Sequence, residues 1–161
     1  MHMASKSQKG KFLNQIPTLM NPEGTSMWSA LGKMIKGTPD RKPPHPIDTS
    51  ALSLEEFATH KYANENFYIW LGHSSIYLQI DCLRIFIDPV FSPSTSPVSI
   101  LGPKAFAFTN NYSTASFPDP DIVIITHDHY DHLDKQAIKD FAEKTKEFIV
   151  PLRFGSILQN W

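Results

Sequence analysis

From residue 67 onward, short stretches of β-branched and aromatic residues alternate with turn-forming residues, a pattern that predicts a domain built on a β-sheet. Five strands are expected, at 67–71, 75–81, 84–88, 121–125 and 147–150. The connection at 81–83 is short enough for a hairpin, and the composition of 121–125 predicts a strand buried on both faces.

Helical periodicity is confined to a few segments. Helices are expected at 27–36, from Ser53 onward, at 133–145 and at 156–161. In the third of these, the residues expected to point inward are Leu133, Ala137, Ile138 and Phe141. A long proline-containing loop is expected between residues 91 and 120, and its aromatic side chains either pack on the core or form a lid that contacts lipid.

This order of elements predicts an α/β fold with two regions. Residues 1–50 are expected to form an N-terminal arm and linker, because the proline-rich stretch Lys42–Pro46 cannot continue a helix or a central strand. Residues 51–161 are expected to carry the folded domain, with functional groups at the ends of its strands.

Composition narrows the class of protein. The chain of 161 residues has a net charge of −1, so no attraction to nucleic acid is expected. Its single cysteine, Cys82, excludes an intramolecular disulfide and favours a reducing compartment. No apolar run approaches the roughly 20 residues that span a bilayer. A cytoplasmic location is therefore expected, with peripheral membrane contact left open.

The strongest chemical signal is the sequence T-H-D-H-Y-D-H-L-D at residues 126–134, directly after the fourth expected strand. Four of its side chains are candidate metal ligands: His127, His129, Asp131 and His132. Imidazole nitrogen and carboxylate oxygen together suit zinc, with manganese or iron as alternatives. Two such ions polarise a substrate oxygen and lower the pKa of a water between them.

Ligating histidines need an acceptor for their second ring nitrogen. The candidates for this role, or for contact with substrate, are Asp88, Asp128, Asp134 and His73. For His73 the alternative is a hydrogen bond within its own strand.

The H-x-H-x-D-H motif after an apolar strand resembles the signature of the metallo-β-lactamase fold superfamily. The segments Trp70-Leu-Gly-His-Ser-Ser75, Ile85-Phe-Ile-Asp-Pro89 and Leu101-Gly-Pro-Lys104 resemble the branch that contains N-acyl-phosphatidylethanolamine phospholipase D. The resemblance implies an αββα sandwich, of which this chain supplies about the first half.

The resemblance also implies roles for individual residues. His127 and His129 match ligands of a first metal, whereas Asp131 and His132 match ligands of a second. Asp131 would also orient the nucleophile as the catalytic residue, and Asp88 would support the site. The implied activity is hydrolysis of a small-molecule or phospholipid-like phosphodiester; the alternative is a lactonase acting on a sugar phosphate lactone.

The family pattern requires further metal ligands from a second half, and the printed sequence ends before them. The chain by itself is therefore expected to have little hydrolase activity. A second half-domain, a companion chain or self-pairing is expected to complete the fold, and a non-catalytic half-domain is the alternative from a different functional class.

Overall fold

The computed structural model describes residues 7–8, 11–12, 16, 32, 42–53, 64–94 and 104–161. The chain divides into two compact units, Met1–Lys42 and Pro43–Trp161. In the first unit, β1 (Ser7–Gln8) pairs antiparallel with β2 (Lys11–Phe12), a hairpin that the sequence pattern did not predict. The helix expected at 27–36 and the one expected after Ser53 lie outside the described residues, Gly32 apart.

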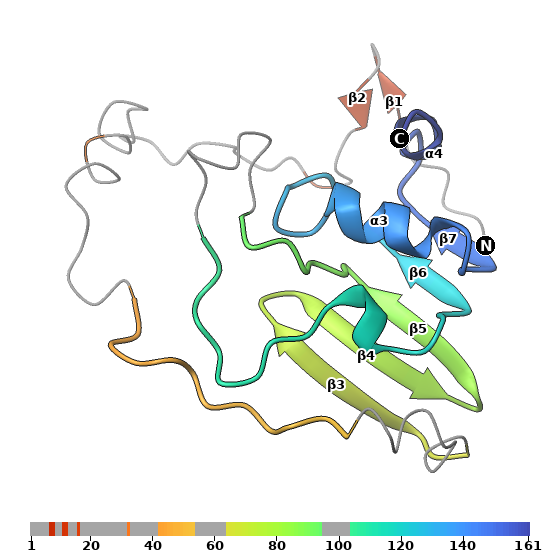
Figure 1. Ribbon diagram of the computed structural model, residues 1–161. Helices are drawn as coiled ribbons and strands as arrows, with labels where there is room; N and C mark the ends of the chain where they lie inside the picture. Colours follow the sequence, from red (N-terminus) through yellow and green to blue (C-terminus); the bar gives the residue numbers. More distant parts are fainter. Residues whose placement is uncertain are drawn as a thin grey trace. The chain divides into compact units, whose positions relative to one another are not determined.

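The second unit is built on one five-stranded sheet in sequence order (Figure 1). Its strands are β3 (Phe67–Gly72), β4 (Ser75–Ile80), β5 (Leu83–Ile87), β6 (Ile122–Ile124) and β7 (Glu147–Ile149). The strands β3, β4 and β5 are antiparallel to one another, whereas β5, β6 and β7 run parallel. All five predicted strands are confirmed, to within two residues at each end.

Two tight turns connect the antiparallel strands. Between β4 and β5, Asp81 and Cys82 have φ angles of 48° and 66°, as a two-residue hairpin turn with left-handed residues requires. At the turn from β3 to β4, the last residue of β3, Gly72, has a φ angle of 102°, and the next residue, His73, has a φ angle of 47°. The second turn brings a histidine to the end of the sheet at which the functional groups gather.

The hydrophobic core lies between one face of the sheet and the helix α3 (Lys135–Ala142). Tyr77, Phe86 and Val123 come from neighbouring strands and are fully buried. Phe141 of α3 stacks on Phe86 with ring centroids 4.9 Å apart. Burial of each such side chain contributes roughly 1.5–3 kcal/mol to folding.

Helix α3 is shorter than predicted at both ends. Asp134 caps its first turn by accepting hydrogen bonds from the backbone N–H groups of Gln136 and Ala137, so Leu133 precedes the helix. At the other end, the N–H groups of Lys144 and Thr145 turn back to the carbonyl of Phe141. The side chains predicted to point inward are buried: Leu133, Ala137, Ile138 and Phe141.

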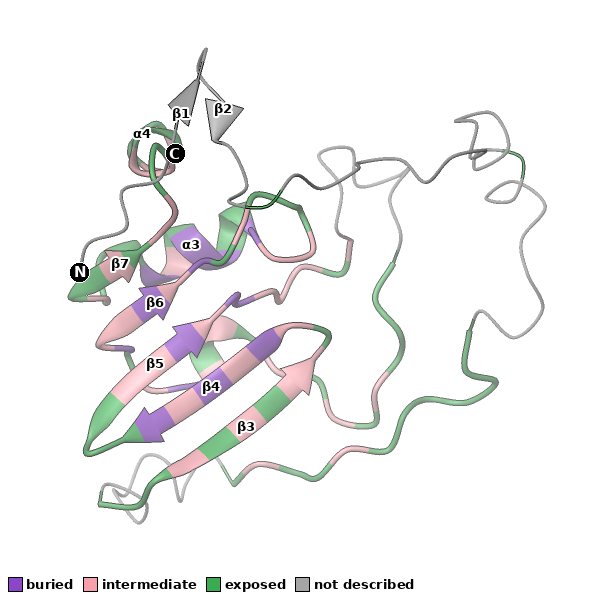
Figure 2. Cartoon of the chain, turned by 180° about the vertical axis from the view of Figure 1, so that it is seen from behind, coloured by how far each residue is buried: buried purple, intermediate pink, exposed green. Residues whose placement is uncertain are grey.

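The second face of the sheet is apolar but incompletely covered. Figure 2 shows exposed and half-buried residues alternating along β3. Paired positions place Tyr68, Leu78, Ile85 and Ile122 in one row across the strands. Tyr68 is 72% exposed, and Ile122 and Ile124 are only half-buried. The expectation that the fourth strand is buried on both faces is therefore wrong, because α3 covers only one side of it.

The long loop contains a 3₁₀ helix, η1 (Thr114–Ser116), and then continues toward β6. Of its aromatic side chains, Phe117 is buried and Phe91 and Tyr112 pack against the core, whereas Phe106 is 47% exposed. Packing on the core is thus confirmed for three of these residues. The short helix α4 (Gly155–Gln159) ends close to its predicted position. Within the described part of the chain, no helix has the length and apolar character needed to cross a membrane.

Candidate metal centre

The site is organised around Asp88, the first residue after β5. Its backbone adopts a left-handed conformation with φ 44°, which few residues other than glycine, asparagine and aspartate accept readily. Its N–H donates to the carbonyl of Ile124 over 2.9 Å, and its own carbonyl accepts the Ser75 hydroxyl over 2.7 Å. These contacts with β6 and β4 fix the backbone, so that the carboxylate lies at the end of the sheet.

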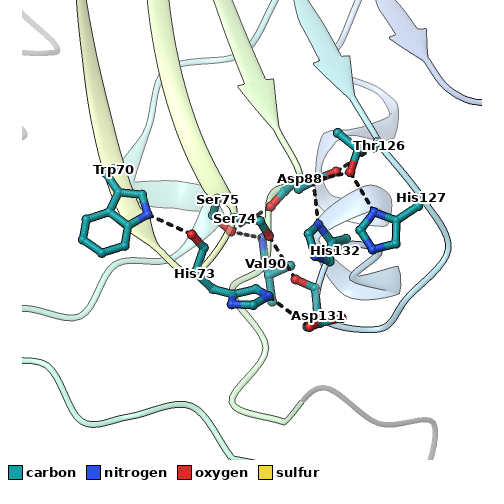
Figure 3. A network of polar contacts seen from close by, with 10 residues as sticks. All are labelled: Trp70, His73, Ser74, Ser75, Asp88, Val90, Thr126, His127, Asp131 and His132. Carbon is teal, nitrogen blue, oxygen red and sulfur yellow. Dashed lines mark hydrogen bonds and ion pairs between the residues drawn. The ribbon is translucent and has the colours of Figure 1, made fainter. Parts of the chain in front are cut away.

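The Asp88 carboxylate is almost fully buried and accepts three hydrogen bonds (Figure 3). Oδ1 accepts the backbone N–H of Thr126 over 2.7 Å. Oδ2 accepts the Thr126 hydroxyl over 2.6 Å and Nδ1 of His132 over 2.8 Å. A buried charge is tolerated because hydrogen-bond donors surround it.

These contacts determine which nitrogen of each ring carries the proton. A carboxylate only accepts, so Nδ1 of His132 donates to Asp88. The single hydroxyl proton of Thr126 also goes to Asp88. The 2.9 Å contact between Thr126 Oγ1 and Nδ1 of His127 therefore requires that His127 donates. In the neutral form of each ring this arrangement leaves Nε2 without a proton, which is the form that binds a metal.

Asp131 lies on the turn that follows His129. The carbonyl of His129 accepts the N–H groups of His132 and Leu133, which curls the chain back toward the sheet. Burial raises the pKa of Asp131, but its own backbone N–H and the nearby rings of His132 and His73 outweigh burial, so the pKa lies below its ordinary value. The carboxylate is therefore ionised at neutral pH.

Two groups of side chains bring ligand atoms within 4.8 Å of one another: His73 with Asp131 and His132, and Asp88 with His127 and His132. Nitrogen and carboxylate oxygen in such groups fit zinc or a similar divalent ion. In the second group, Oδ2 of Asp88 is already occupied by two donors. Asp88 therefore fits the role of orienting the histidines better than that of a ligand, as carboxylates beside zinc-binding histidines do.

Other predicted site residues lie differently. The ring of His129 is exposed and contacts that of His127, with centroids 4.8 Å apart, but belongs to neither group. Asp128 is exposed and, within the described residues, makes no hydrogen bond to a histidine ring. The Asp134 carboxylate caps helix α3 and accepts hydrogen bonds from the backbone N–H groups of Phe91 and Ser92. Asp134 thus holds the loop after β5 and does not orient a histidine.

Three contributors were not predicted from the sequence: Thr126, Ser74 and Trp70. Thr126 links Asp88 to His127. Ser74 donates to the carbonyl of Asp131 over 3.2 Å, and the indole N–H of Trp70 donates to the carbonyl of His73 over 2.9 Å. Their positions in the sequence could have identified them. Polar residues directly beside a predicted strand end can reach the end of a neighbouring strand.

Residues 83–161 match the family described as "Beta-lactamase superfamily domain". These residues make up just under half of the chain, and over them the chain is similar to the beta-lactamase superfamily. The α/β architecture that the order of elements predicts is accordingly confirmed.

Three curated relatives are similar to parts of this chain. An uncharacterized protein of Mycobacterium tuberculosis is 39% identical over 93 residues, which cover 57% of this chain and 25% of that protein. An N-acyl-phosphatidylethanolamine-hydrolyzing phospholipase D of Caenorhabditis elegans is 29% identical over 115 residues, covering 69% and 32%. A metal-dependent hydrolase of Sulfolobus acidocaldarius is 40% identical over 65 residues, covering 40% and 23%. The chain thus spans about a quarter to a third of the length of these relatives.

Proposed function

We propose that this chain carries the metal-binding site of a zinc-dependent hydrolase that cleaves a phosphodiester. The observation that supports this most directly is the hydrogen-bonding of Asp88, which leaves Nε2 of His127 and of His132 free on the same side of the sheet.

The relatives support the reaction class. The archaeal relative is named as a metal-dependent hydrolase, and the nematode relative is named for hydrolysis of a phospholipid. A phospholipid-like or other small phosphodiester is therefore the proposed substrate. The cytoplasmic location, contact with a membrane surface and completion of the fold by a second half-domain or partner chain stay predictions.

A bound divalent ion supplies Lewis-acid activation of a phosphoryl oxygen and of water. The protein's own groups supply geometry. Asp88 and Thr126 hold the rings of His127 and His132 through Nδ1. The ionised Asp131 would accept a hydrogen bond from the attacking water and so orient it. The ligand roles of His127, His129, Asp131 and His132 remain part of this proposal.

Zinc binding by the full chain tests the proposal. Titration against a chromophoric chelator should show zinc uptake that is lost in Asp131→Asn and His132→Ala. The matched control is Asp119→Asn, because Asp119 is exposed and its contact is a 3.8 Å ion pair with Lys144. Equal zinc binding by the wild-type chain and both site variants would reject the metal site.

A second experiment identifies which type of bond is hydrolysed. It compares the turnover of bis(p-nitrophenyl) phosphate with that of a sugar phosphate lactone at saturating zinc. The chain alone offers few ligands per ion, so low turnover is expected and the ratio of the two rates decides. Preference for the lactone would replace the phosphodiesterase assignment by the lactonase.

A further inference from the structure

The turn between β3 and β4 reaches the candidate metal centre from a different part of the fold than the H-x-H-x-D-H segment. Nε2 of His73 lies 3.0 Å from Oδ2 of Asp131, 58 residues later in the sequence. The hydroxyl of the next residue, Ser74, donates to the backbone carbonyl of Asp131 over 3.2 Å. In Figure 3 the His73 ring points toward Asp131 and away from its own strand. Two neighbouring residues of one turn therefore hold both the side chain and the backbone of Asp131.

This turn is kept in an unusual conformation. A φ of 47° at His73 is unfavourable for a residue other than glycine, and residues with such backbone angles concentrate at functional sites. The indole N–H of Trp70 donates to the carbonyl of His73 over 2.9 Å and so supports this conformation from the preceding strand. The direction in which the His73 ring points is thus fixed by its own backbone and by a neighbouring side chain.

The identity of its partner determines the protonation of the His73 ring nitrogen. Asp131 is ionised at neutral pH, and a carboxylate only accepts hydrogen bonds. Nε2 of His73 therefore carries a proton and donates it in the 3.0 Å hydrogen bond. His132 is arranged in the opposite way, because it donates through Nδ1 to Asp88. A ligating ring nitrogen must have no proton, so this hydrogen bond lets His73 serve the carboxylate and not an ion.

We propose that His73 is a positioning residue for Asp131: its Nε2–H holds Oδ2, so that the carboxylate presents one orientation to an ion and to the attacking water. The inference rests on the proposed metal site and gives Asp131 the kind of orienting partner that Asp88 gives His132. Carboxylates that ligate a metal are themselves hydrogen-bonded, and loss of such a partner typically costs about 10–100-fold in metal affinity or activity. Among the described residues, no other side chain forms a hydrogen bond with the Asp131 carboxylate.

The exposure of the contact separates this role from a structural one. The side chains of His73 and Asp131 are 62% and 42% exposed. Interactions between exposed side chains contribute little to stability, because water competes for both groups. The same contact can still restrict the directions in which a carboxylate points. Loss of the hydrogen bond should therefore weaken ion binding without a matching loss of stability.

Zinc titration of the full chain, comparing His73→Gln with His73→Leu, tests the inference. The glutamine amide can donate to Oδ2 of Asp131, whereas leucine has no donor. His73→Leu should lower the zinc affinity by about 10–100-fold, and His73→Gln by less than about 10-fold. The control is His45→Ala, in an exposed segment, which should bind zinc like the wild-type chain. Both His73 variants should unfold at nearly the same urea concentration, and midpoints that fall in parallel with the zinc affinities would make the role structural and overturn the inference.

Ring ¹⁵N chemical shifts give a direct readout of the proton on His73. In the wild-type chain its Nε2 should show the shift of a protonated nitrogen both before and after zinc is added. The inference fails if zinc gives this nitrogen the shift of a metal-bound one, if His73→Gln loses as much zinc affinity as His73→Leu, or if neither variant loses any. In each of these outcomes zinc uptake by the wild-type chain still supports the proposed function, whereas a wild-type chain that takes up no zinc overturns both.

Discussion

Replacement of Asp88 by asparagine is the sharpest test of how the strand ends are joined. Asparagine is nearly isosteric and tolerates a left-handed backbone, so the φ of 44° adds no strain. Its one oxygen can keep the 2.7 Å bond from the N–H of Thr126. Its NH₂ group then faces two donors, the Thr126 hydroxyl and Nδ1 of His132, where the carboxylate accepted both.

The expected cost follows from these two lost hydrogen bonds. A buried donor left without an acceptor costs about 1–3 kcal/mol. The Thr126 hydroxyl can rotate and the His132 side chain is 18% exposed, so both regain part of this energy from water. We therefore expect Asp88→Asn to lower the free energy of unfolding by about 2–4 kcal/mol.

The assay is urea unfolding followed by circular dichroism, with Asp81→Asn as the control. Asp81 has a φ of 48° but is exposed, and its carboxylate contacts Asn66 Nδ2 at a long 3.5 Å. The control should change the free energy of unfolding by less than about 0.5 kcal/mol. If Asp88→Asn changed it by no more than the control, the carboxylate would not hold the strand ends together.

Three further predictions concern groups that make no hydrogen bond to a histidine ring in the described residues. Asp134→Ala removes both the α3 cap and the acceptor for the N–H of Ser92, so urea unfolding should show a loss of about 2–4 kcal/mol, and a loss below about 1 kcal/mol would contradict this. Burial raises the pKa of Tyr77 to about 12, so in an alkaline absorbance titration one of the five tyrosines should ionise last, and Tyr77→Phe should remove that step; an unchanged curve would rule it out. The Lys146 ammonium holds the pKa of Asp121 below its ordinary value, so the stabilisation is present above that ordinary value and lost as pH falls through the lowered pKa. Asp121→Asn should therefore flatten the fall of the urea midpoint between about pH 6 and about pH 3, and curves of equal slope would refute this.

The strands could be predicted because their apolar residues recur locally. Segments such as 75–80 and 122–124 are rich in β-branched residues, and their neighbours contain turn-forming residues. The boundaries of α3 were harder to predict from the sequence, because Asp134 looked like one more acidic residue beside the histidines. Only the structure shows that its carboxylate is used by backbone N–H groups.

The composition of the candidate site could be predicted, but its connections could not. Spacing within 127–132 indicated a metal site without showing which side chains converge. The contact of His73 with Asp131 depends on the left-handed turn after β3, and the link from Asp88 to His127 depends on a hydroxyl at residue 126. Such contacts between distant residues depend on how the strands align, which local residue patterns do not specify.

The pairing order of the sheet has a consequence for how the molecule assembles. The meander from β3 to β5 joins neighbours through short turns, whereas the bonds of Asp88 with Thr126 and of His73 with Asp131 span 38 and 58 residues. Contacts between such distant residues close late, because the intervening chain must first give up its freedom. A chain arrested with only its hairpins formed would have most of its antiparallel structure but no convergent histidines. The chain would then bind an ion only after the parallel strands β6 and β7 had paired with β5. Metal binding would therefore indicate that folding was complete.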